Sequence, residues 1–357
     1  MLTARVLLAP HLPTLLVDQH RGHRTEMLEA YAAAARAFAA EEPAAAVVLS
    51  ARWISPGAFL ADAARRHATL TDYYGFGVEV RHDCPGEPAL ARALVAAALA
   101  GGMRAAAAER GVDSGVTVPM HFLAPRKTLP VVPVSLARRP AAEHRAWGAA
   151  LRSALDAWSR PVAFVVGGML SHNVHAWNLG RETPEAQALD ARVLEALAGG
   201  AWGEIARIEK RRHAKAQPEA NLLHLEVLRG LLGADLPGTV RCYEAGPGVG
   251  AALVEFLVGD PRPVPPPPEP EFLEGKKRDP RLHVPARPQR RPSRPPLPQR
   301  RRSPRPDTKG RTRATPDRPR PGTKGRARAT PDRPRPGTKG RTRPGGRRGR
   351  APGSGAR

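Results

Sequence analysis

The sequence has few of the residues that mark several classes of protein. Its 357 residues include only two cysteines, Cys84 and Cys242, which give neither a disulfide framework nor a zinc-finger spacing. We therefore expect a reducing, cytoplasmic location. No run of about 18 apolar residues occurs, so we expect no transmembrane helix and no membrane partner. The apolar N-terminus is interrupted by His11 and two prolines, and we expect no signal peptide there.

Acidic residues are scarce in one part of the chain. Residues 261–357 hold 30 of the 57 Lys and Arg residues but 7 of the 33 Asp and Glu residues, a net charge of +23, whereas residues 1–260 carry +1. This tail also holds 24 of the 40 prolines and repeats Thr-Lys-Gly-Arg every 15 residues. Such a composition cannot bury enough apolar surface to fold. We predict a globular domain at 1–260 and a disordered tail at 261–357.

The charge of the tail predicts a second property, non-specific binding of nucleic acid. Arginine-rich segments neutralise phosphates and release counterions, so such binding weakens steeply as salt rises. A near-exact repeat of this kind could equally be recently expanded coding sequence with little function. The tail composition alone does not separate these two interpretations.

Alternating strands and helices predict an α/β fold, with a central, mostly buried sheet flanked by helices. Apolar runs rich in β-branched residues indicate buried strands, and apolar residues at helical spacing indicate amphipathic helices. We expect strands at 5–9, 44–50, 129–136, 162–166, 238–243 and 251–258. We expect helices at 25–40, 88–99, 141–158, 183–197, 202–211 and 217–232.

Polar residues follow three of the predicted strands. His11, Arg52 and His172 each come just after a buried strand, where open α/β sheets usually place their ligands. Histidine can transfer a proton near neutral pH, so His172 is a candidate catalytic residue. The alternative for His172 is an ordinary loop histidine beside a helix cap. Aromatic residues make up 4% of the chain, and the cluster Tyr73, Tyr74 and Phe76 therefore indicates a pocket wall or a packed surface loop.

Short motifs occur in a specific order along residues 4–258. They are Ala-Pro-His-x-Pro at 9–13, Leu-Ser-Ala-Arg-Trp at 49–53, Asp-Tyr-Tyr-Gly-Phe at 72–76, Cys-Pro-Gly at 84–86, Gly-Val-Asp-Ser-Gly at 111–115, Leu-Pro-Val-Val-Pro-Val at 129–134 and Gly-Gly-Met-Leu-Ser-His-Asn at 167–173. This series resembles the class III extradiol ring-cleavage dioxygenases of the LigB type, including the subgroup similar to DOPA 4,5-dioxygenases. The resemblance implies a non-haem metal enzyme of aromatic catabolism that opens catechol-type rings with O2. The resemblance does not decide whether the protein forms homo-oligomers or hetero-oligomers.

The resemblance also implies which residues form the site. The family holds Fe(II), or zinc in the DOPA-dioxygenase-like subgroup, with two histidines and a third protein ligand. By resemblance, His11 matches the first metal ligand and His172 matches the acid/base histidine. The third ligand should come from residues 218–226, where the candidates are Glu219, Glu226 and Asn221.

The chain departs from the family pattern at two positions. Arg52 stands where the family has a second histidine ligand, and a guanidinium has no lone pair to give a metal. Ser114 stands where the family has a histidine that contacts substrate or oxygen. We predict substrate contacts at Arg52, Ser114 and Ser171. The remaining histidines considered are expected to be surface or partly buried residues and not ligands: His121, His175, His213 and His224.

These departures leave two interpretations of the domain. It is either a ring-cleaving dioxygenase with a degenerate metal site, or a non-catalytic member or partner subunit that binds a small carboxylated aromatic. Arg52 suits the second role because its planar fork matches the two oxygens of a carboxylate.

Overall fold

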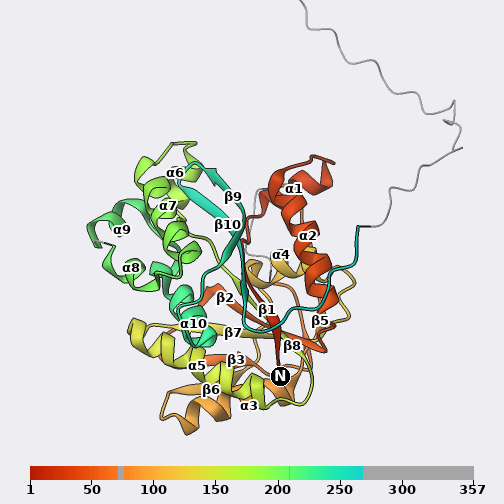
Figure 1. The fold of residues 1–357 in the computed structure, drawn as a ribbon. Coiled ribbons are helices and arrows are strands. Elements are labelled where there is room, and N and C mark those ends of the chain that lie inside the picture. Colours follow the sequence, from red (N-terminus) through yellow and green to blue (C-terminus); the bar gives the residue numbers. More distant parts are fainter. Residues whose placement is uncertain (71–75, 209, 268–357) are drawn as a thin grey trace, which may run out of the picture. The chain divides into compact units, whose positions relative to one another are not determined.

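The computed structural model of the chain describes residues 1–70, 76–208 and 210–267, without the side chains of 210–212. A mixed eight-stranded sheet has the order β6-β3-β7-β2-β8-β1-β10-β9 (Figure 1). Its strands are β1 (Leu2–Ala9), β2 (Ala45–Ser55), β3 (Phe59–Asp62), β6 (Ala105–Ala108), β7 (Val131–Ala137), β8 (Val162–Gly167), β9 (Thr239–Gly246) and β10 (Val249–Leu257). The short strands β4 (Arg66–His67) and β5 (Cys84–Pro85) pair with each other.

Helices flank this sheet, which confirms the predicted α/β class (Figure 1). They are α1 (Thr14–His20), α2 (Glu26–Ala40), α3 (Pro88–Ala100), α4 (Ser114–Leu123), α5 (Ala141–Ala157), α6 (Val174–Asn178), α7 (Pro184–Ala198), α8 (Trp202–Arg207), α9 (Lys210–Ala216) and α10 (Leu223–Leu232), with a 3-10 turn η1 (Glu219–Leu222). Among the described residues, no helix is long and apolar enough to cross a membrane.

The central strands send alternate side chains to two separate hydrophobic clusters. In β1, Val6 and Leu8 join one cluster, which includes residues of α3, α5, α7 and α10. Leu7 and Ala9 join the other, which includes residues of α2 and α4. Alternation follows from the two-residue period of a strand, and both faces are covered. The three central strands β2, β8 and β1 are therefore held rigidly, and their ends form a fixed platform.

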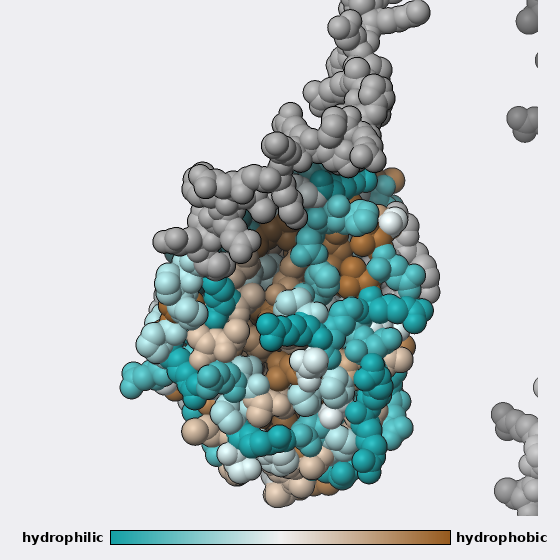
Figure 2. Space-filling view, turned by 90° about the vertical axis from the view of Figure 1, so that its right-hand side faces the viewer, coloured by the Kyte–Doolittle hydropathy of each residue, from teal (hydrophilic) through white to brown (hydrophobic). Residues whose placement is uncertain are grey.

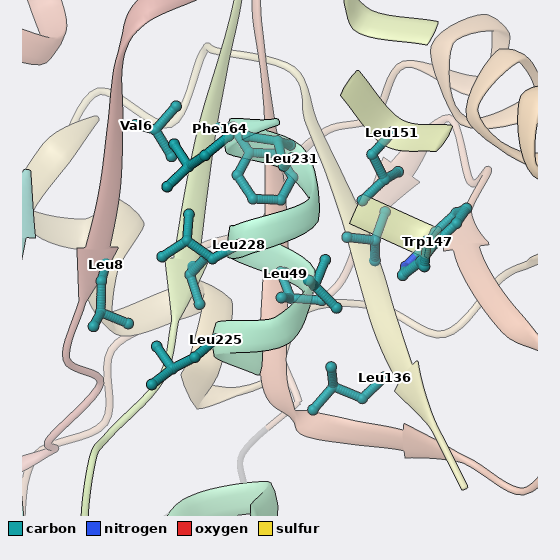
Figure 3. Close-up of a cluster of buried hydrophobic side chains, with 14 of the residues drawn as sticks. Val6, Leu8, Leu49, Leu136, Trp147, Leu151, Phe164, Leu225, Leu228 and Leu231 are labelled. Atoms are coloured by element: carbon teal, nitrogen blue, oxygen red, sulfur yellow. The ribbon is translucent and has the colours of Figure 1, made fainter. Parts of the chain in front are cut away.

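Helix α10 covers one face of this platform. Its residues Leu225, Leu228 and Leu231 recur at helical spacing and point toward the sheet near Leu49 and Phe164 (Figure 3). Each of these side chains is almost fully buried. Burying a leucine contributes about 1.5–3 kcal/mol to stability, so α10 is firmly anchored. This anchor fixes the segment just before it, which carries Glu219.

Helix α2 covers the opposite face of the sheet. Its N-cap is Thr25, whose hydroxyl accepts a hydrogen bond from the backbone N–H of Leu28 at 3.2 Å, as the predicted helix 25–40 requires. Met27, Tyr31 and Phe38 of α2 are buried. Figure 2 views the side of the molecule on which α1 and α2 lie; hydrophilic residues cover much of this face, and the most hydrophobic ones show mainly in its upper part.

The predicted helix 202–211 ends early, because α8 stops at Arg207 and Ile208 is extended. Two further predicted elements differ from the structure. The predicted helix 217–232 is wrong at its start, because Ala220, Asn221 and Leu222 have φ of 47°, 52° and 61° and interrupt it. The predicted strand 44–50 continues to Ser55 through an irregularity, since Ser50 pairs with Ser135 and Ile54 with the next residue, Leu136. Both departures lie beside the candidate site.

The domain keeps contacts beyond the predicted boundary at residue 260. The backbone N–H of Arg262 donates to Glu41 Oε1 at 3.1 Å, and the Arg262 carbonyl accepts from Arg5 at 3.3 Å. The predicted disorder of the tail and its predicted binding of nucleic acid concern mainly residues 268–357, which lie outside the described residues. Tyr73 and Tyr74 of the predicted aromatic cluster lie outside them too. All of these stay predictions.

Candidate functional site

The ends of three adjacent parallel strands bring the predicted residues together. Strand β8 lies between β2 and β1 and is parallel to both, so the carboxyl ends of all three share one edge. A pocket of about 210 Å³ opens there, and His11, Arg52, Ser114 and His172 line it. The rest of its wall is mostly apolar, with residues Leu12, Pro13, Phe76, Val174, Trp177, Asn178 and Val249.

A buried ion pair lies at the base of this site. His11 Nε2 is 2.9 and 3.0 Å from the two carboxylate oxygens of Glu219, and both side chains are almost completely buried. The backbone N–H of Met169 also donates to Glu219 Oε2 at 2.7 Å. His172 is close by, with its Nδ1 3.8 Å from Glu219 Oε1. The rings of His11 and His172 have centroids 6.0 Å apart.

Each member of the pair favours the charged form of the other. Burial alone would lower the pKa of His11, but the negative charge of Glu219 and the hydrogen bond to it leave that pKa raised. Burial would raise the pKa of Glu219, yet His11 brings it down to about 2. The pKa of His172 is lowered, chiefly by burial and further by the charges of His11 and Arg52. Glu219 acts in the opposite direction, but the net shift favours the uncharged form of His172, which can accept a proton.

Arg52 reaches the pocket from the irregular part of β2. Its backbone N–H donates to Ser50 Oγ at 3.2 Å, and Ser50 Oγ donates to Asp113 Oδ1 at 2.6 Å. Arg110 binds the other oxygen of Asp113 at 2.6 Å. A Cβ on Gly115 would lie 2.3 Å from Ser50 Oγ, so glycine allows this close contact. Bulges next to sites re-aim side chains, which explains how Arg52 faces the pocket from within a strand.

Glu219 is delivered by an unusual backbone turn. Gln217, Ala220, Asn221 and Leu222 all have positive φ although none is glycine. A left-handed residue with a Cβ costs roughly 1–2 kcal/mol, and such residues concentrate at functional sites. The turn directs Glu219 to His11, between the end of α9 and the anchored start of α10.

The other candidates for the third ligand lie elsewhere. Glu226 pairs with Arg145 at 2.7 Å, away from His11. Asn221 lines a separate cavity of about 660 Å³, which is larger than the pocket but contains neither His11 nor His172. Of the three ligand candidates, Glu219 is therefore the residue placed beside His11.

Ser171, a predicted substrate contact, is fully buried, and its hydroxyl donates to Asp190 at 2.7 Å.

Sequence reasoning missed His224. It was expected to be a surface or partly buried histidine, but it is fully buried against Gly168, and neither ring nitrogen has a hydrogen-bond partner among the described residues. Burial lowers its pKa to about 4, although Glu219 acts in the opposite direction. Its position inside the apolar run from Leu222 to Leu225 was a signal that it would be buried.

Comparisons with known proteins agree with this fold. The family model for the catalytic LigB subunit of aromatic ring-opening dioxygenases matches residues 5–254. The chain is a member of the LigB family, as the order of its motifs predicted, and its fold and family are those of a ring-cleaving dioxygenase.

Individual proteins similar to the chain include a curated relative and a solved structure. The curated relative "Dioxygenase tasH" of Hapsidospora irregularis is 32% identical over 161 residues, which are 42% of this chain and 48% of that protein. The chain thus matches about half the length of this relative. The crystal structure of the uncharacterized protein JW3007 from Escherichia coli K12 has a TM-score of 0.53 and 20% identity, covering 71% of this chain and 99% of the other. This second similarity shows the fold alone.

Proposed function

We propose that the pocket binds a small catechol-type aromatic carboxylate, that Arg52 holds the carboxylate, and that metal-dependent ring opening is weak or lost. The observation that carries this proposal is the place of Arg52. It lines the pocket beside His11 and His172, and its charge lowers the pKa of His172. Membership of the LigB family implies an aromatic substrate. A bidentate arginine–carboxylate contact adds a reason for that substrate to be an acid.

The residues present fit the metal of the family poorly. Among the described residues, no group of three or more His, Cys, Asp or Glu side chains is arranged to hold a metal ion. His11 and Glu219 already bond to each other, and Arg52 offers no lone pair where a second histidine is expected. Two like unit charges about 4 Å apart repel by about 4 kcal/mol at an intermediate dielectric. Fe(II) and zinc should both bind weakly here.

The pocket wall suits an aromatic ring. Leu12, Phe76 and Trp177 supply apolar surface, while Arg52 and the two histidines supply the polar side. Pockets of this kind bind a ring by burial and fix its orientation through a few polar groups. In this proposal, His172 exchanges protons with the ring hydroxyls and Ser114 contacts the ligand. The substrate contact predicted for Ser171 is not part of it, because that hydroxyl is bonded to Asp190.

The test compares two probes that differ by one carboxylate, 3,4-dihydroxybenzoate and catechol. Hydrogen bonds to charged groups contribute about 1.5–3 kcal/mol, so the wild-type protein should bind the acid at least about tenfold more tightly in calorimetry. Arg52→Ala should remove this preference. Arg207→Ala, at an exposed residue of α8 that does not line the pocket, is the matched control and should keep it. Equal affinity of the wild type for both probes contradicts the proposal.

A second candidate is an active extradiol dioxygenase of the family. The observation that favours it is the meeting of His11, Glu219 and His172 in one site, as expected for a first ligand, a carboxylate ligand and an acid/base histidine. Iron content and catechol turnover separate the two candidates.

A further inference from the structure

Asp190 is a buried carboxylate with no part in the proposed chemistry. It lies on α7, is fully buried, and uses both of its oxygens. Oδ1 accepts from the backbone N–H of Ser171 at 2.9 Å, and Oδ2 accepts from the hydroxyls of Ser171 at 2.7 Å and Tyr243 at 2.9 Å. Burying a charged carboxylate is costly unless it is well bonded, so a carboxylate retained at such a position calls for a reason.

The residue that Asp190 holds is the middle of a small backbone ladder. Ser171 forms an isolated bridge with Pro218, and the neighbouring His172 forms one with Val249. On one side of the ladder, Glu219 N–H donates to Leu170 O at 2.9 Å and His172 N–H donates to Gln217 O at 2.9 Å. The segment after β8 therefore sets the position of His172 and Glu219 relative to each other.

The other side of the ladder is built around Asp190. Gly250 exchanges backbone hydrogen bonds with Leu170 at 3.0 Å and Ser171 at 3.1 Å. A Cβ on Gly250 would lie 1.8 Å from Asp190 Oδ2, so only glycine lets the carboxylate approach β10 this closely. Asp190 thus ties α7, the segment after β8, β9 and β10 together at one point, directly behind the pocket.

We propose that Asp190 is a positioning residue of the pocket, which acts through Ser171 to keep His172 and Glu219 in register. This inference rests on the proposed function in that it concerns the same pocket. Asp190 does not line the pocket, so it acts only by fixing residues that do. Burial raises its pKa to about 6, which is the cost of keeping a carboxyl group at this point.

The experiment uses the full chain with Asp190→Ala and the conservative Asp190→Asn. Two measurements are made on each: the NMR signals of the His172 ring, assigned by comparison with His172→Gln, and the affinity for 3,4-dihydroxybenzoate. Asp190→Ala should shift the ring signals and weaken binding by about tenfold. Asp190→Asn keeps a carbonyl for the Ser171 N–H and should restore both. Val193→Ala, at a buried core residue further along α7, is the control and should change neither.

A folded Asp190→Ala protein with wild-type ring signals and affinity would overturn the inference. If Asp190→Ala does not fold, Ser171→Ala and Tyr243→Phe each remove one hydroxyl from the carboxylate and should shift the same ring signals to a smaller extent. Unchanged signals in both variants overturn the inference as well. Failure of the wild type to bind 3,4-dihydroxybenzoate contradicts the proposed function, while the ring signals still decide the role of Asp190.

Discussion

The two sides of the pocket differ in how they are built. On one side, His11, His172 and Glu219 are buried or nearly so and are joined by an ion pair, a backbone ladder and a strained turn. On the other side, Arg52 is exposed and emerges from an irregular strand. The first side depends on interactions throughout the fold, whereas the second can change with little cost to stability. The buried residues of such a site can therefore stay in place while a substitution at the one exposed position changes what the site binds.

The largest expected difference between the two sides is in stability. Glu219→Ala leaves His11 without its buried partner and removes the acceptor of the Met169 N–H, so the free energy of unfolding should fall by about 3–5 kcal/mol. Arg52→Ala, at an exposed site, should change it by no more than about 0.5 kcal/mol. Denaturant unfolding measures both. Glu226→Ala is the control, because that residue pairs with Arg145 near the surface and should cost about 1 kcal/mol or less.

A loss in Glu219→Ala no greater than that in Glu226→Ala would contradict the view that the first side is a buried, interdependent unit. An equally large loss in Arg52→Ala would remove the contrast between the two sides.

A second expected effect is the pH dependence that Asp190 gives to stability. Burial raises the pKa of Asp190 from an ordinary 3.8 to about 6, so ionisation of this carboxyl group opposes folding. The protonated group stabilises the folded state fully below about pH 4, and this stability is lost as pH rises through 6. Moving a pKa that far corresponds to about 3 kcal/mol. The difference in unfolding free energy between Asp190→Asn and the wild type should therefore change in favour of Asn by about 2–3 kcal/mol from pH 4 to pH 7.5.

Unfolding curves of both proteins at several pH values provide this comparison. Tyr243→Phe, which keeps the carboxyl group, should retain the wild-type direction of the pH dependence. A difference between Asp190→Asn and the wild type that stays constant with pH would show that this carboxyl group does not titrate as its burial implies.

The smallest effect concerns the turn that carries Glu219. Ala220 has a φ of 47°, which glycine adopts without strain, so Ala220→Gly should stabilise the protein by about 1 kcal/mol. The same change at Ala198, in the last turn of α7, should destabilise it by about 0.5–1 kcal/mol. Thermal unfolding of the two variants decides this. Loss of stability in both would mean that the left-handed turn is not strained.

Much of the fold follows from the periodicity of apolar residues. The buried strand at 162–166 and the helix at 25–40 were predicted almost to the residue, because a continuous apolar run marks a strand buried on both faces and helical spacing shows which face of a helix is buried. The strand at 105–108 was missed because four alanines carry no such pattern. The break of the predicted helix at 220–222 was missed because left-handed backbone at Ala, Asn and Leu leaves no mark in the sequence.

The site was predictable only in its outline. The strand ends brought His11, Arg52 and His172 into one pocket, as expected from a parallel arrangement. Which of Glu219 and Glu226 lies beside His11 depends on the left-handed turn at 220–222, and the spacing of residues in the sequence does not reveal that turn. Asp190 could have been suspected, because it falls among the apolar positions of α7 with Ala186, Val193 and Leu197. Its partner Ser171 belongs to the motif at 167–173, but nothing in the sequence links Ser171 to Asp190.

We propose that Arg52 replaces a metal ligand of the family and leaves a pocket for an aromatic acid. The most direct test of this role of Arg52 is iron content and catechol turnover, measured side by side in oxygen-free preparations of the wild type and Arg52→His, with Arg207→His as the control. The wild type and the control should hold little iron and turn catechol over slowly or not at all. Arg52→His should hold more iron, with low turnover because Ser114 is unchanged. Stoichiometric iron with fast turnover in the wild type would contradict the account.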